Sequence, residues 1–173
     1  TQNDDLLGDW IFAGAAFPEH QPDSLAYFEL LNLDVTQVMF GARADILEKF
    51  QACRDKAPDF IDRTARRILA LSPKIVGCTS MFAQNCASLA LLRRIRELAP
   101  EVITMMGGAN CDTPMGEVLH SNFPWVDYLM TGEADLTFGP FCRALLDGRC
   151  ELPKGMLGPQ HRLQPEPVQR ATT

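Results

Sequence analysis

From residue 74 to residue 148 the chain repeats one pattern three times: an apolar run, a small polar turn and an amphipathic helix. The apolar runs lie at 74–79, 102–106 and 126–130, so they begin 24 to 28 residues apart. Parallel strands need a crossover of about this length, usually a helix, and such crossovers are right-handed. The repeat therefore predicts a doubly wound, Rossmann-like or flavodoxin-like α/β domain with helices on both faces of a parallel sheet.

Apolar spacing and end signals mark the helices between these runs. Residues 85–99 carry an apolar stripe at helical spacing, formed by Leu89, Leu92, Ile95 and Leu98, and Pro100 closes the helix. A short helix is expected over 114–122. A third runs from about Phe138 to Gly148, where glycine suits a helix C-terminus.

The first 70 residues break this rhythm and are expected to form a helical N-terminal part. Helical spacing is found at 6–17, 24–33 and 45–71, the last with a possible break at Pro58. Three strands are few where about five are usual. The sheet is therefore expected to be incomplete, so that either a strand lies near 35–40 or an N-terminal piece is missing. We divide the chain into residues 1–70, an α/β core over 71–150, and a C-terminal hairpin or tail over 151–173.

Composition excludes several classes of function. A net charge of -6 and a pI near 5.0 argue against a nucleic-acid partner. No apolar run approaches the roughly 18 residues of a membrane span, and the N-terminus lacks signal-peptide features, so we expect no membrane partner and a cytoplasmic location. The cysteines have no metal-binding spacing, so no metal site is expected; they are Cys53, Cys78, Cys86, Cys111, Cys142 and Cys150.

Ligands of open α/β sheets bind outside the carboxyl ends of the strands. These ends are predicted at 78–80, 107–110 and 131–133, and all three are small or polar with a glycine in or beside them. Any one such loop is as readily explained by turn chemistry alone. Together they favour a pocket, although neither the dinucleotide-binding GxGxxG pattern nor the P-loop is present.

The stretch from Val76 to Asp135, which contains GGANC and FPWVDYLMTGEAD, resembles the cobalamin-binding domain of cobalamin-dependent radical SAM enzymes. The similarity is greatest to the subgroup that modifies ribosomally made peptides, the RiPP-maturation enzymes, many of which are regarded as C-methyltransferases. The early GDWIFAGAAF is similar to a GEW-type segment of that subgroup, so the resemblance spans roughly residues 6–158. The chain departs from the pattern at Ala134 and Asp135, where the family often has Gly-Glu. The family's first strand would precede Thr1, and its radical SAM barrel would follow residue 173.

The resemblance implies that the corrin and the nucleotide tail lie across the three strand ends, with Gly107 and Gly108 letting them pass close to the backbone. The implied cofactor-binding residues are Cys78, Thr79, Ser80, Met81, Gln84, Gly107, Gly108, Ala109, Asn110, Thr131, Gly132 and Glu133. No catalytic residue is expected in this chain. Phe123 and Trp125 are expected to pack in the interior or against another domain.

The function implied is that of a cobalamin carrier within a larger enzyme, which would hold S-adenosylmethionine and a [4Fe-4S] cluster elsewhere and methylate a peptide carbon. The expected partners are cobalamin, the radical SAM barrel of the same parent chain and a peptide substrate. The Asp-x-His-x-x-Gly pattern that supplies an axial histidine is absent, so base-off cobalamin without a protein histidine is expected. Two alternatives stay open: a flavodoxin-like binder of another cofactor or nucleotide, and a cofactor-free module that binds a peptide or protein partner.

Overall fold

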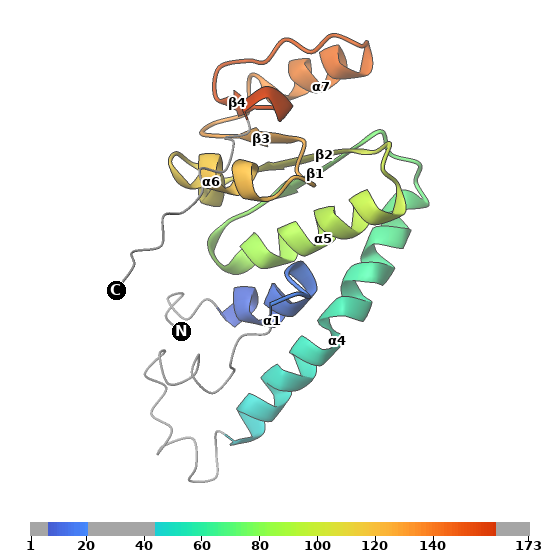
Figure 1. The fold of residues 1–173 in the computed structure, drawn as a ribbon, viewed down its shortest axis with the longest axis vertical. Helices are drawn as coiled ribbons and strands as arrows, with labels where there is room; N and C mark the ends of the chain where they lie inside the picture. Colours follow the sequence, from blue (N-terminus) through green and yellow to red (C-terminus); the bar gives the residue numbers. More distant parts are fainter. Residues whose placement is uncertain (1–6, 21–43, 162–173) are drawn as a thin grey trace, which may run out of the picture.

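The computed structural model describes residues 7–20 and 44–161 (Figure 1). Its sheet has the strand order β1-β2-β3-β4. The first three strands, β1 (Ile75–Thr79), β2 (Ile103–Gly107) and β3 (Tyr128–Met130), are parallel, and β4 (Met156–Leu157) is antiparallel to β3. This mostly parallel open sheet confirms the predicted α/β class and its Rossmann-like character.

Helices cover both faces of the sheet. On one face lie α5 (Asn85–Leu98) and α6 (Met115–Asn122), and the helical N-terminal part packs beyond α5 as α1 (Leu7–Ala16) and α4 (Ala44–Leu69) (Figure 1). On the other face lies α7 (Phe138–Leu146). Short 3-10 turns follow β1, β2 and β4, at Phe82–Gln84, Ala109–Cys111 and Pro159–His161.

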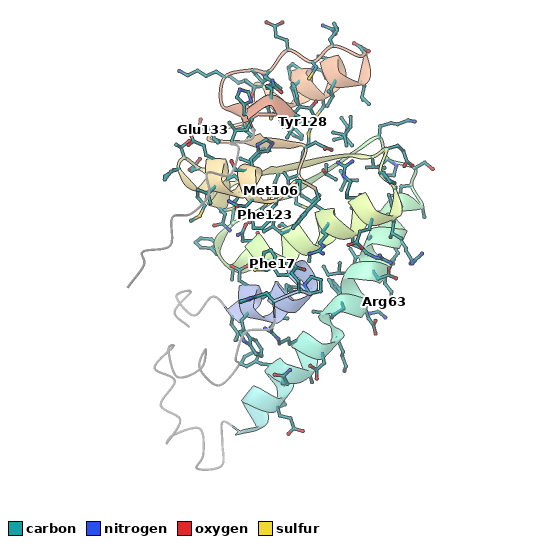
Figure 2. The ribbon with its side chains drawn as sticks, viewed as in Figure 1. Phe17, Arg63, Met106, Phe123, Tyr128 and Glu133 are labelled. Atoms are coloured by element: carbon teal, nitrogen blue, oxygen red, sulfur yellow. The ribbon has the colours of Figure 1, made fainter. Side chains whose placement is uncertain are left out.

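Two hydrophobic clusters separate these faces. Met105 belongs to the cluster under α7, and the next residue, Met106, belongs to the larger cluster under α5. Successive side chains of a strand point to opposite faces, so β2 supplies both clusters. Figure 2 shows Met106 and Phe123 on the α5 side of the sheet.

The edge strand β4 was not predicted. Met156 and Leu157 pair with Met130 and Leu129, so the C-terminal segment joins the sheet where a local hairpin around Gly158 was expected. A strand of two residues is too short to show a period in sequence. The predicted helix at 24–33, the possible strand at 35–40 and the tail from residue 162 lie outside the described residues.

Helix α4 continues through Pro58 instead of breaking there. Proline removes one backbone donor, which favours a kink or an end. Ala57, Ile61 and Ala65 are buried on either side of it, at most 5% exposed. Their burial stabilises the helix on both sides of the proline, so that it continues through Pro58.

Among the described segments, none of the helices combines the length and the apolar character needed to cross a membrane.

Candidate functional site

A groove of about 630 Å³ lies between the sheet and α7, near the carboxyl ends of β1 and β2. Its floor is formed by the sheet and its wall by α7 with the turn before it. The lining residues are Ile75, Gly77, Cys78, Thr79, Met105, Met106, Gly107, Gly108, Met130, Ala134, Asp135, Phe138, Gly139 and Cys142.

Two glycines leave part of the floor of the groove without side chains. Gly77 pairs with Met105, and Thr79 pairs with Gly107, so the glycines lie diagonally on neighbouring strands. A Cβ atom on Gly77 would lie 3.8 Å from Phe138 and Met105, and one on Gly107 would lie 3.7 Å from Met130. These are ordinary contact distances, so the protein itself does not require glycine at either position. A side chain there would instead occupy the groove.

Gly108 has a different role. Its φ angle is +96°, and a Cβ atom there would lie 2.5 Å from the carbonyl oxygen of Ser80. Glycine is therefore needed for the backbone conformation and for the contact between two loops of the protein. Gly108 also lines the groove, and its contact with a ligand stays a prediction.

Four of the twelve predicted binding residues line the groove: Cys78, Thr79, Gly107 and Gly108. The other eight lie outside its lining, in the three loops at the carboxyl edge: Ser80, Met81, Gln84, Ala109, Asn110, Thr131, Gly132 and Glu133.

Asn110 joins the first two of these loops. Its side-chain amide donates to the hydroxyl of Ser80 and to the carbonyl of Phe82, each at 2.9 Å, and its backbone N–H donates to the carbonyl of Ser80 at 3.1 Å. Gln84 accepts from the N–H of Met81 at 3.1 Å. These polar groups are therefore engaged in fixing the loops.

The loop after β3 is hydrogen-bonded to the loop after β2 and to the segment before β4. Asp112 accepts from the N–H of Gly132 at 2.8 Å, and the N–H of Thr131 donates to Gly155 at 2.8 Å. Gly132 has a φ of +78°, and a Cβ atom there would meet open space. Glu133 is exposed at this edge of the sheet (Figure 2).

Sequence reasoning missed the wall of the groove. Ala134, Asp135, Phe138, Gly139 and Cys142 all line it. Phe138 and Cys142 are four residues apart and so share one helix face, which was a usable signal. Asp135, noted only as a departure from the family pattern, brings a carboxylate to the lining.

The thiols of the groove are protonated at neutral pH. Burial raises the pKa of Cys78 to about 11 and also raises that of Cys142. A thiolate is the form that binds metals and attacks electrophiles. In the described parts of the chain, no three His, Cys, Asp or Glu side chains gather in a way that could hold a metal ion.

The described histidines lie elsewhere. His120 is fully buried, with Nε2 3.1 Å from the carbonyl oxygen of Asp127, and Nδ1 of His161 accepts from the N–H of Gly158 at 3.1 Å. His20 follows α1. None of the three belongs to the lining of the groove.

The FPWVDY stretch is structural. The Phe123 ring lies 5.2 Å from Trp125 and 5.4 Å from Phe17, and Trp125 donates to the carbonyl of Leu89 at 3.0 Å. Asp127 accepts from the N–H of Thr104 at 2.9 Å and pairs with Arg96. The contacts of Asp127 lie at the amino ends of β2 and β3, and none of the residues in these contacts lines the groove.

Comparison with known proteins shows a similarity over about half of the chain. The chain is 28% identical over 88 residues to the anaerobic magnesium-protoporphyrin IX monomethyl ester cyclase of Rubrivivax gelatinosus. The match covers 51% of this chain and 16% of the cyclase, so it concerns a small part of that protein. No protein-family model matches the chain, and no solved structure matches it significantly.

The groove has room for a small ligand or for one part of a large one. Its volume falls within the usual range of small-molecule pockets, about 300–1,000 Å³. The bare floor accepts a flat group, and the hydroxyl of Thr79 and the carboxylate of Asp135 offer polar contacts. An extended cofactor such as cobalamin fits if its tail enters the groove while the rest lies over the edge loops.

Proposed function

We propose that this chain is the cobalamin-binding domain of a cobalamin-dependent radical SAM enzyme. The observation that carries the proposal is the glycine-floored groove at the carboxyl edge of a parallel sheet, where such folds bind ligands. The similarity to the cyclase supports a relationship to cobalamin- and radical SAM-related proteins at this general level.

Gly77, Thr79 and Gly107 would form the floor beneath the nucleotide tail, with Phe138 and Asp135 at its side. The corrin would lie over the loops that Asn110 and Asp112 fix. The bound cofactor supplies methyl transfer through its carbon–cobalt bond, and the protein supplies its placement. The cofactor would be held base-off, without a protein histidine on cobalt, because the sequence lacks the Asp-x-His-x-x-Gly pattern that supplies one.

For the parent enzyme we propose C-methylation of a ribosomally made peptide in the cytoplasm, with a radical SAM barrel of the same chain carrying S-adenosylmethionine and a [4Fe-4S] cluster. This finer assignment rests on the resemblance of GGANC and FPWVDYLMTGEAD to the peptide-modifying subgroup. The relative's name makes a cyclic tetrapyrrole ester the competing substrate class. Turnover of a peptide and of a magnesium porphyrin ester by the full-length parent would separate the two.

The test is retention of hydroxocobalamin. The purified chain is mixed with the cofactor, desalted and examined by visible spectroscopy, and a retained base-off spectrum is expected. Gly77→Ala and Gly107→Ala should each weaken retention while the circular dichroism spectrum stays unchanged, since neither Cβ would clash with the protein. Gly14→Ala, in α1 and outside the groove, is the matched control and should bind as the wild type does.

If the full-length parent also fails to retain cobalamin, the proposal is wrong. A flavin or nucleotide copurifying with the chain would favour the flavodoxin-like alternative. Binding of a peptide that is unaffected by Gly77→Ala, with no cofactor retained, would favour the interaction module.

A further inference from the structure

The loop after β1 is held in an unusual conformation beside the proposed site. Phe82 has a φ of +50°, in the left-handed region that favours glycine, and its side chain is 66% exposed. A bulky residue keeps such a conformation only when its surroundings impose it. Asn110 holds the loop from the β2 side through Ser80 and Phe82.

Helix α1 holds the same loop from the opposite side. A Cβ atom on Gly8 would lie 2.5 Å from the carbonyl oxygen of Ala83, so only glycine allows α1 to approach this closely. The contact joins residues 75 positions apart in the chain.

Asp9, the next residue of α1, caps a helix other than its own. Its Oδ1 atom accepts from the N–H of Cys86 at 2.6 Å, in the first turn of α5. Helix α5 has no cap from its own N-cap residue, because Gln84 makes no capping bond and instead accepts from Met81. A carboxylate at a helix N-terminus is favoured by the unpaired N–H groups and by the helix dipole.

The surroundings of Asp9 are consistent with this role. Burial raises its pKa, and the hydrogen bonds with Cys86 and Asn85 act in the opposite direction. Arg54 of α4 lies over the Trp10 ring at 4.5 Å and donates to the Trp10 carbonyl, which anchors α1 at this point.

From these contacts we infer that Gly8 and Asp9 are positioning residues for the ligand site: they hold the loop from Ser80 to Gln84 and the start of α5 in place. The GDW segment and α1 are then part of the site's support, although they lie outside the α/β core. This inference rests on the proposed function for the identity of the ligand, but the positioning itself can be tested without one.

The first measurement is hydrogen exchange in the ligand-free full chain. Gly8→Ala and Asp9→Ala should each speed exchange of the amides from Met81 to Cys86 by at least about fivefold to tenfold. Gly8→Ala would displace the loop, and Asp9→Ala would remove the helix cap. Asp9→Asn keeps an acceptor oxygen and should restore most of the protection. Asp147→Ala removes an exposed ion pair with Arg149, outside the groove lining, and should leave these amides unchanged.

The second measurement is affinity for hydroxocobalamin, which should fall by about tenfold or more in Gly8→Ala and Asp9→Ala but not in Asp147→Ala. Unchanged exchange in both α1 variants would overturn the inference, as would changed exchange with unchanged cobalamin affinity. If the wild-type full-length parent binds no cobalamin, the proposed function fails separately, and the exchange result still decides the positioning role. Should Asp9→Ala not fold, Asp9→Asn and Gly8→Ala carry the same comparison.

Discussion

The carboxylate of Asp112 accepts from the backbone N–H of Gly132 at 2.8 Å, which ties the loop after β2 to the loop after β3. Asn110, two residues earlier, ties the loop after β2 to the loop after β1. Two neighbouring polar residues therefore connect all three strand ends that the sequence had grouped into one site. Their side chains fix the loops on which a ligand at this edge would rest.

Asp112→Ala should lower the free energy of unfolding by about 1 kcal/mol, because Gly132 loses a hydrogen bond to a largely exposed acceptor. Asp112→Asn keeps an acceptor oxygen and should lose less than half of that. Urea unfolding followed by circular dichroism measures both. Equal losses in the two variants would show that the carboxylate's charge, and not the hydrogen bond, is what matters.

The two adjacent glycines should differ in their tolerance of alanine. Gly108→Ala is expected to cost about 2–4 kcal/mol, because its φ is +96° and its Cβ would lie 2.5 Å from Ser80. Gly107→Ala should change the free energy of unfolding by less than about 1 kcal/mol, since its Cβ would make only ordinary contacts. Thermal unfolding of the pair tests the contrast, and a similar loss in both variants would contradict the distinction.

Asp127→Ala should destabilise the chain by about 2 kcal/mol, because the N–H of Thr104 loses its acceptor and Arg96 loses its carboxylate partner. Arg96 keeps its hydrogen bonds to the carbonyl of Pro100 and the hydroxyl of Thr104. The Asp127 and Arg96 side chains are 24% and 28% exposed, so we place the effect below that of a fully buried pair. Asp147→Ala removes a much more exposed pair with Arg149 and should cost less than about 0.5 kcal/mol. The comparison is made by urea unfolding, and equal costs would argue against the structural role of FPWVDY.

Cys78 should react slowly with iodoacetamide at pH 7.5, and its rate should rise about tenfold per pH unit up to pH 9.5, because its pKa is about 11. Exposed Cys53 provides the internal reference, and peptide mass spectrometry measures both rates. Rapid alkylation of Cys78 at neutral pH would reveal a thiolate and reopen a direct role for it.

The same burial has a consequence for stability at high pH. The folded-state pKa values of Cys78 (about 11), Cys86 (about 12) and Cys111 (about 12) lie above the ordinary 9.0, so the unfolded chain loses these protons first. Stability is therefore expected to be retained below pH 9 and to fall as the pH rises from 9 toward 12. Replacing all three by Ser or Ala should flatten that decline, as measured by urea unfolding at pH 8 and pH 10.

The sequence by itself determined the repeated α/β units and the helical N-terminal part, because apolar period, glycine and proline signals are local properties of the chain. It also located the strand ends at residues 79, 107 and 130 within about a residue, and those ends do meet at one edge. The assignment of particular binding residues stays a prediction.

Only the tertiary structure decided which residues face one another across that edge. The packing of α7 over β1 and β2 makes a wall from residues 134–142. Gly108 lies against the backbone of Ser80, in the loop of the neighbouring strand. Asp9 caps a helix that begins more than 70 residues away. Such contacts follow from strand register and helix docking, which bring distant segments together. They produce no period or spacing in the sequence, so they could not be predicted from it.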